Sequence, residues 1–221
     1  MNKTVIITSG RSGSTKLIES MRQHPDIRVF SEPFNTNNVG SLAEFYPVRE
    51  GWLTPEEKEE ICTAENLDKW MSKYDLCKIL YCHILNDVEE SLKKYKKVLL
   101  VRDLFYTFTS LCVAKQTEQW TDHTPYEGYI QLDLEHLRSF TQWSYVREQY
   151  WRKRCDKVIY YIEPTQDQCD SICELMNIRK WKVKETGSQR INRPLEQVII
   201  NYSEARRVYA NTRKEIEKWD L

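Results

Sequence analysis

Short apolar runs rich in β-branched residues alternate along this chain with longer stretches in which apolar positions recur at helical spacing. Runs of this kind are typical of strands that are buried on both faces of a parallel sheet. Five of them predict strands, over residues 5–8, 27–30, 77–81, 98–101 and 158–162.

The stretches that follow these runs predict helices. Leu17, Ile18 and Met21 recur at helical spacing after the first run, and residues 104–112 carry a similar pattern after the fourth. Ser203 is expected to cap a last helix. The repeated order of strand then helix predicts an α/β fold, in which helices flank both faces of a mostly parallel central sheet and ligands bind beyond the carboxyl ends of the strands.

Length and composition set the domain organisation. A chain of 221 residues, 40% of them hydrophobic, is long enough for one substantial core and short for two, so residues 1–221 are expected to form a single domain. Residues 35–75 and 115–135 are polar and aromatic with weak periodicity. We expect these two stretches to be insertions on the acceptor side of a binding site.

The charge balance and the apolar pattern disfavour two classes of partner. Lys+Arg and Asp+Glu both count 33, and there is no polybasic run of the kind that binding to nucleic acid normally needs. No apolar run approaches the roughly 18 residues of a membrane span, and no basic leader precedes the first predicted strand. We expect a cytoplasmic protein that binds neither nucleic acid nor membrane.

The segment over residues 8–17, TSGRSGSTKL, joins the first predicted strand to the first predicted helix. Gly10 and Gly13 permit close approach of the backbone, and the amides at the start of a helix can hold a phosphate or a sulfate. Arg11 adds a charged donor, which packing alone does not explain. Three hydroxyl side chains add further donors, those of Ser12, Ser14 and Thr15.

This segment differs from the nucleotide-binding loop of ATPases. The pattern GxxxxGK[ST] counted from Gly10 requires a second glycine at position 15, where Thr15 stands. An ATPase is therefore disfavoured, and the remaining alternative to an anion site is an ordinary turn rich in glycine and serine.

A second pair of residues suits a phosphate. Arg102 ends the run VLLVR, and Ser110 follows it eight residues later in a helical stretch. The planar donors of arginine bind two phosphate oxygens at once, and a hydroxyl from the next helix can complete the contact. Taken alone, Arg102 is equally well explained by a surface ion pair.

Together the two segments resemble the sulfotransferase family that uses 3′-phosphoadenosine 5′-phosphosulfate (PAPS). The resemblance implies a P-loop-like sulfotransferase fold, in which a loop of the form PRSGST binds the 5′-phosphosulfate and an Arg…Ser pair binds the 3′-phosphate. Arg102 and Ser110 match the pair, while Gly10 stands where the family usually has proline. The residues that match the loop are Arg11, Ser12, Gly13, Ser14 and Thr15.

The likeness extends beyond these motifs. Ala114, Gln116, Thr117 and Trp120 resemble a pattern of the bacterial carbohydrate sulfotransferases that modify trehalose. The likeness covers most of the chain and is weakest over residues 35–75. It implies PAPS as the donor and a hydroxyl group, on a carbohydrate, as the acceptor.

Two residues are candidates for the general base. Glu32, in FSEPFN, lies among apolar neighbours that limit the hydration of its carboxylate, and the resemblance implies a glutamate base in this early region. The alternatives are a solvent-exposed loop acid and an ion-pair partner for a loop arginine. His83, at the end of the third run, is the rival base, although a lone histidine in an apolar strand is more often a core residue.

Several cations have no single interpretation. Lys78 suits either a buried ion pair or a contact to the acceptor. Lys184, Arg190 and Arg193 suit either a basic loop over the nucleotide, as the family implies, or a solvated charged loop.

Two competing functions remain open. In a P-loop kinase or NTPase, Asp103 would hold magnesium, but the missing Gly-Lys argues against it. A non-catalytic nucleotide-binding protein of the same fold would have no need of Glu32. The seven cysteines lack the spacing of a zinc ligand set. A sulfuryl group carries less charge than a γ-phosphoryl group, so an arginine and backbone dipoles can suffice without magnesium, and we expect no metal. Nothing in the sequence indicates the oligomeric state.

Overall fold

The computed structural model describes residues 1–34, 54–119, 125–184, 191 and 193–219. Its contacts divide the chain into two compact units. We call the first, Met1–Val101 with Arg154–Glu185, the sheet unit, and the second, Arg102–Lys153 with Thr186–Leu221, the helical unit. The single domain remains a prediction.

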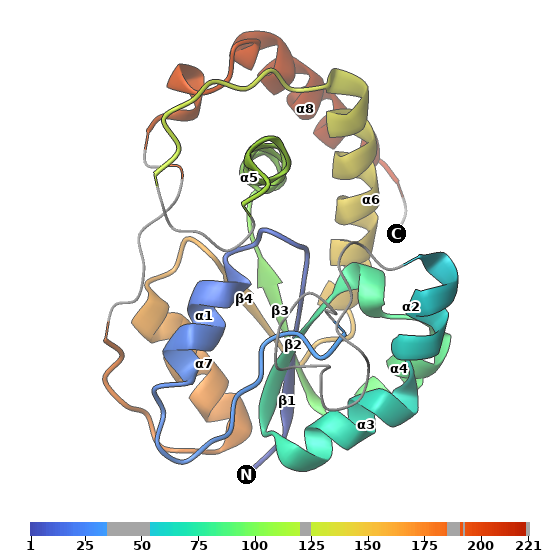
Figure 1. The fold of residues 1–221 in the computed structure, drawn as a ribbon, viewed down its shortest axis with the longest axis vertical. Helices are drawn as coiled ribbons and strands as arrows, with labels where there is room; N and C mark the ends of the chain where they lie inside the picture. Colours follow the sequence, from blue (N-terminus) through green and yellow to red (C-terminus); the bar gives the residue numbers. More distant parts are fainter. Residues whose placement is uncertain (35–53, 120–124, 185–190, 192, 220–221) are drawn as a thin grey trace. The chain divides into compact units, whose positions relative to one another are not determined.

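The sheet unit is built on a parallel sheet of four strands in the order β2-β1-β3-β4 (Figure 1). The strands are β1 (Thr4–Thr8), β2 (Leu76–Leu80), β3 (Lys96–Val101) and β4 (Lys157–Tyr160). Together with the flanking helices, this sheet confirms the predicted α/β class. Because β1 is central and apolar at both faces, its carboxyl end lies in the middle of the sheet, where ligands of such folds bind.

The strand predicted over residues 27–30 is reduced to a single bridge between Val29 and Leu76. The segment does run parallel to β2, since the Phe30 amide donates to the Leu76 carbonyl at 2.8 Å. However, the Arg28 amide donates at 2.9 Å to the carboxylate of Asp75 rather than to a backbone carbonyl. A side chain therefore takes the place of a regular ladder bond, and the strand does not form.

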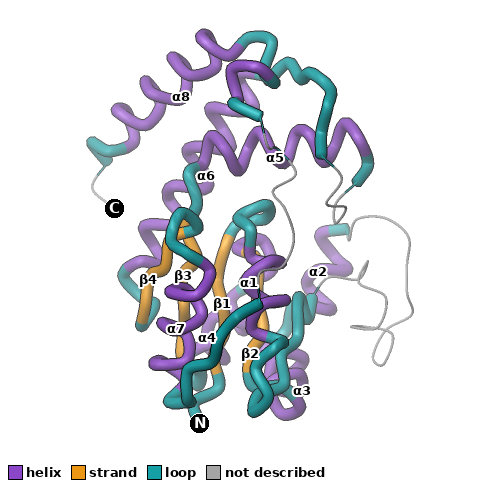
Figure 2. The backbone as a smooth tube through the Cα atoms, turned by 90° about the vertical axis from the view of Figure 1, so that its left-hand side faces the viewer, coloured by secondary structure: helices purple, strands orange, loops and turns teal. Residues whose placement is uncertain are grey.

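Helices cover both faces of the sheet (Figures 1 and 2). Helices α1 (Ser14–Met21) and α7 (Thr165–Met176) pack on one face, where Leu17 and Cys173 join a fully buried core with Ile6 of β1. Helices α3 (Ala64–Lys73) and α4 (Asn86–Leu92) lie on the other face. This burial positions the start of α1 at the carboxyl end of β1.

The region of weak periodicity contains regular structure. Helix α2 (Pro55–Ile61) and helix α3 lie within it, and the Thr63 hydroxyl caps α3 by accepting from the Asn66 amide at 3.2 Å. Residues 35–53 of the expected acceptor-side insertion lie outside the described part of the chain.

The helical unit contains α5 (Leu104–Thr117), α6 (Leu134–Arg152), α8 (Tyr202–Ile216) and the short 3-10 helix η2 (Leu195–Gln197). Its core joins all four of these elements. The buried members of this core include Phe105, Phe108, Leu137, Leu195 and Tyr209.

Two features of this unit depart from the sequence pattern. Helix α6 buries Thr141, Ser144 and Glu148, so its inner face is too polar to give an apolar periodicity. The residue at the cap of α8 is Asn201 rather than Ser203. The Asn201 side chain bonds both the amide and the carbonyl of Leu132, at 3.0 and 2.9 Å, so it serves a tertiary contact instead of a helix cap.

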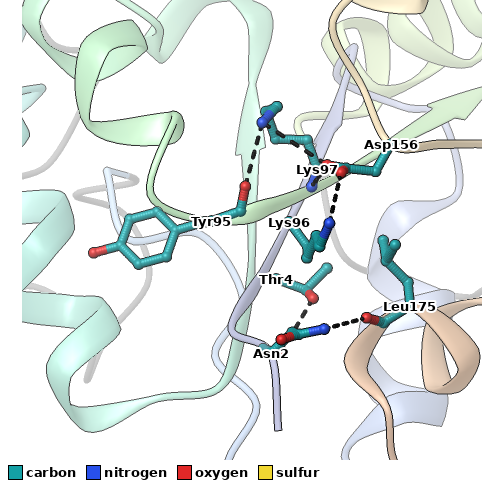
Figure 3. Close-up of polar contacts among 7 residues, drawn as sticks. All are labelled: Asn2, Thr4, Tyr95, Lys96, Lys97, Asp156 and Leu175. Atoms are coloured by element: carbon teal, nitrogen blue, oxygen red, sulfur yellow. Dashed lines mark hydrogen bonds and ion pairs between the residues drawn. The ribbon is translucent and has the colours of Figure 1, made fainter.

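Exposed polar contacts join the elements at the amino end of the sheet (Figure 3). Asp156 accepts from the Lys97 amide at 2.8 Å and pairs with Lys96 Nζ at 3.0 Å. Asn2 donates to the Leu175 carbonyl at 3.0 Å, which links the start of the chain to α7. These contacts lie at the edge opposite to the expected ligand site.

Candidate anion-binding site

The loop between β1 and α1 has an unusual backbone. Arg11 has φ 64° and Gly13 has φ 86°, so two of its residues lie in the left-handed region. Only a few per cent of residues other than glycine adopt such a conformation, and they cluster at ligand sites. The conformation of Arg11 therefore supports a functional interpretation of the loop over an ordinary turn.

Gly13 is required at its position, whereas Gly10 is not. A Cβ atom at residue 13 would lie 2.1 Å from Cε2 of Tyr161, so only glycine lets that ring pack against the loop. A Cβ atom at residue 10 would meet nothing nearer than Leu80 at 3.9 Å. Position 10 thus has room for a side chain, and the departure from the family's proline need not alter the loop.

The polar side chains of the loop differ in burial. Ser12 is fully buried and Ser14 is 4% exposed, while Arg11 and Thr15 are half-buried. Gly13 is the N-cap of α1 and offers no side-chain acceptor to the first amides of the helix. Such amides have no partner within the helix and carry the positive end of its dipole, which suits an anion.

Lys78, on β2, contacts the hydroxyl groups at the start of α1. Its Nζ donates to Thr15 Oγ1 at 3.0 Å and to Ser14 Oγ at 3.3 Å, and its side chain is only 3% exposed. A buried ammonium group of a neighbouring strand thus contacts the hydroxyl groups at the start of α1.

Glu32 forms a buried ion pair with the same lysine. Its Oε1 lies 2.7 Å from Lys78 Nζ, and its side chain is 11% exposed. The segment is held in place because the Lys78 amide donates to the Ser31 carbonyl at 2.9 Å. Glu32 is therefore in an ion pair, but its partner is Lys78 of β2 and not a loop arginine. A role as base is compatible with this pair because the carboxylate is the form that accepts a proton.

His83 follows β2 in a short 3-10 helix, η1 (Tyr81–His83), rather than at the end of a strand. It is 8% exposed, and its ring meets Phe34 edge to face at a centroid distance of 6.1 Å. Its burial and its contact with Phe34 resemble the core histidine considered from the sequence. Its role as the rival base remains a prediction.

Arg102 and Ser110 lie in the helical unit. Arg102 directly follows β3 in the chain and is half-buried, and Ser110 lies on α5 with 8% exposure. Asp103, between them, caps α5 by accepting from the amides of Phe105 and Tyr106 at 3.0 and 3.1 Å. Binding of a 3′-phosphate by Arg102 and Ser110 remains a prediction.

The second oxygen of Asp103 is also engaged. Tyr209 of α8 donates its hydroxyl to Asp103 Oδ2 at 3.3 Å. Burial, together with the charge of Asp103, raises the pKa of Tyr209 to about 12, so the phenol keeps its proton at neutral pH. Asp103 therefore has a structural function in the helical unit.

The late basic residues are only partly described. The Arg193 guanidinium donates to the carbonyls of Tyr126 and Gly128 at 3.2 and 2.7 Å, which holds a turn of the helical unit together. Lys184 is anchored through its backbone, whose amide donates to Gln23 Oε1 at 2.9 Å. Arg190 lies outside the described residues, as does Trp120 of the trehalose-type pattern.

The sequence left two contributors unassigned. Lys78 carried a signal, because a charged residue inside an apolar strand must be paired, but its partners were not evident. Tyr161 carried no signal, since only the tertiary structure brings its ring to Gly13. Among the described residues there is no acid, histidine and cysteine cluster suited to a metal ion, and no helix long and apolar enough to cross a membrane.

Comparison with known proteins gives a fold and no family. No family model matches the sequence, and no curated protein matches it. A sulfotransferase structure from Alicyclobacillus acidocaldarius is similar, with a TM-score of 0.50, 14% identity, and coverage of 96% of this chain and 92% of that chain. Shikimate kinase from Bacteroides thetaiotaomicron also has a TM-score of 0.50, with 11% identity and coverage of 80% and 100%.

A second shikimate kinase, from Acinetobacter baumannii in complex with shikimate, matches at a TM-score of 0.50 and 12% identity, with coverage of 80% of this chain and 94% of that chain. At these identities the likeness concerns the fold. The chain therefore has the P-loop-like α/β fold that is shared by kinases and sulfotransferases.

Proposed function

We propose that this protein is a sulfotransferase that moves a sulfuryl group from PAPS to an acceptor hydroxyl. The observation that carries the proposal is the loop of residues 9–13, with its strained Arg11, together with the buried Lys78 that contacts Ser14 and Thr15. Two cationic side chains and the start of a helix provide donors for the 5′-phosphosulfate.

The reaction would proceed by in-line displacement. The acceptor oxygen forms a bond to sulfur while the bond from sulfur to the 5′-phosphate oxygen breaks, and the acceptor proton passes to the Glu32 carboxylate. The leaving group is adenosine 3′,5′-bisphosphate, whose growing charge Arg11 and the loop amides stabilise. In such loose transition states, positioning and charge neutralisation account for most of the catalysis.

In this proposal Arg102 and Ser110 bind the 3′-phosphate. Their spacing of eight residues matches the family pattern, with Arg102 directly after β3 and Ser110 within α5. A bidentate arginine contact to phosphate is stronger than a hydroxyl contact, so Arg102 makes the larger contribution.

A kinase that uses ATP and magnesium is the competing function, since kinases share the fold. In that class Asp103 would coordinate the metal. The structural bonds of both Asp103 oxygens, to the α5 amides and to Tyr209, favour the sulfotransferase.

The acceptor is proposed to be a carbohydrate. Sugars bind to aromatic faces, and Tyr129 of the helical unit is 64% exposed on the turn that Arg193 holds. The likeness to trehalose-modifying enzymes points to the same class.

A thermal-shift measurement tests the donor. Adenosine 3′,5′-bisphosphate at about 100 times its Kd should stabilise the protein by about 2.7 kcal/mol, whereas ATP with magnesium and ADP should stabilise it less. Arg102→Ala should reduce the shift with the bisphosphate and leave the shift with ADP, which lacks a 3′-phosphate, unchanged. Stabilisation by ATP with magnesium but not by the bisphosphate would show that the protein is a kinase or NTPase.

A further inference from the structure

Lys78 connects two parts of the candidate site. Its Nζ lies 2.7 Å from Glu32 Oε1, 3.0 Å from Thr15 Oγ1 and 3.3 Å from Ser14 Oγ. An ammonium group has three hydrogens to donate, and these three acceptors match that number. One buried cation therefore interacts with both the candidate base and the anion-binding loop.

The contact with Lys78 decides whether the hydroxyl groups of Ser14 and Thr15 donate or accept hydrogen bonds. Lysine only donates, so the oxygens of Ser14 and Thr15 act as acceptors toward Lys78. Each hydroxyl then keeps its own hydrogen as a donor, which is the group that an anion at the loop requires. Lys78 thus prepares the loop for an anion in addition to supplying positive charge.

The contact of Lys78 with Glu32 competes with its interaction with an anion at the loop. Within a site that is 3% and 11% exposed at the two side chains, the carboxylate and a bound anion both attract the same ammonium group. A stronger interaction of Lys78 with one must weaken its interaction with the other, because the charge and the donors of one ammonium group are shared between them.

We propose that Lys78 is a positioning residue that couples occupation of the loop by the donor anion to the state of Glu32. Without an anion, Lys78 holds Glu32 as a paired carboxylate. Arrival of the anion draws the ammonium group toward the loop, and the carboxylate becomes a better proton acceptor when the 5′-phosphate group of the donor occupies the loop. This inference rests on the proposed function, whose donor supplies the anion.

Binding of adenosine 3′,5′-bisphosphate to four proteins tests the coupling: the wild type, Glu32→Gln, Lys78→Met and the double variant. Linkage is reciprocal, so removal of the Glu32 charge should tighten binding by about fivefold or more, the lower range of coupling between sites. In the Lys78→Met background the same change should have little effect, because the shared cation is gone. Lys78→Arg keeps the charge and should retain part of the gain.

Two results would overturn the coupling. If Glu32→Gln tightens binding equally with and without Lys78, direct repulsion between Glu32 and the anion explains the effect. If Glu32→Gln leaves binding unchanged in both backgrounds, the two sites are independent. Circular dichroism checks the fold of each variant, and where Lys78→Met does not fold, Lys78→Gln replaces it in the cycle.

The same cycle with ADP separates this inference from the proposed function. If the bisphosphate does not bind the wild type, the proposed donor is wrong, and the ADP cycle still decides whether Lys78 couples Glu32 to a 5′-phosphate at the loop. If the bisphosphate binds and its cycle is additive, the coupling is wrong and the donor assignment stands.

Discussion

Clusters of lysine and carboxylate occur at both ends of the parallel sheet, and they differ in exposure to water. At the amino end, the side chains of Lys96 and Asp156 are 44% and 28% exposed (Figure 3). Toward the carboxyl end, those of Lys78 and Glu32 are 3% and 11% exposed.

The difference decides what each ion pair does. Exposed pairs contribute roughly 0–1 kcal/mol to stability, because water screens the charges and both side chains lose entropy. In a buried pair, removal of one partner leaves the other charge unpaired away from water, which costs about 3–5 kcal/mol of stability. Substitutions at the amino end should therefore have little effect on stability, whereas at the carboxyl end the residues that we propose for the chemistry also stabilise the fold.

The largest expected effect is on turnover at the carboxyl end. Glu32→Gln keeps the size of the side chain but cannot accept a proton, so turnover should fall about 10²–10⁴-fold, the usual contribution of a general base. Sulfuryl transfer to a sugar acceptor measures it. His83→Asn is the control and should keep turnover within a few-fold of the wild type. If His83→Asn abolishes turnover while Glu32→Gln leaves it within a few-fold of the wild type, His83 is the base.

A stability measurement compares the two ends directly. Lys78→Met removes the ammonium group from beside a buried carboxylate and should lower the free energy of unfolding by about 3–5 kcal/mol. Lys96→Met, at the exposed cluster, should lower it by less than about 1 kcal/mol. Urea denaturation of both variants measures the difference. Equal losses would mean that burial does not distinguish the two pairs.

A pair of glycine substitutions tests the loop at the carboxyl end. Gly13→Ala forces a side chain into the left-handed region and against Tyr161, so it should destabilise the protein by about 2 kcal/mol and weaken bisphosphate binding. Gly10→Ala is the matched control, because its Cβ has room. It should change neither property. Loss of binding in Gly10→Ala would show that the ligand approaches the backbone there.

The smallest effect is expected at the amino end, as a change with pH. Burial acts to raise the pKa of Asp156, but the Lys97 amide and the charges of Lys96 and Lys97 outweigh it, so the pKa lies below its usual value. The stabilisation is therefore present above the unfolded pKa of about 3.9 and is lost as the pH falls through the lower folded value.

Asp156→Asn should accordingly lower stability at pH 7 by less than about 1 kcal/mol, and the difference from the wild type should vanish near pH 2. Thermal unfolding across this pH range measures it. A difference that grows as the pH falls would mean that Asp156 has an environment other than the one described.

The sequence determined those features that depend on neighbours in the chain. Apolar runs predicted all four strands of the sheet, because such strands are buried on both faces. The glycine, arginine and hydroxyl pattern of residues 8–17 predicted the turn from β1 into α1, because the left-handed region and the helix start require particular residues. The P-loop-like fold was implied by the resemblance of residues 11–15 and of Arg102 with Ser110 to the sulfotransferase family.

Only the tertiary structure decided which distant groups meet. The pairing of Lys78 with Glu32 depends on the segment before Glu32 lying beside β2, and the contact of Tyr161 with Gly13 depends on β4 lying beside β3. Helix α6 was missed because its buried face carries Thr141, Ser144 and Glu148, which give no apolar periodicity. These contacts form between elements that are far apart in the chain. The periodicity of a single element therefore does not predict them.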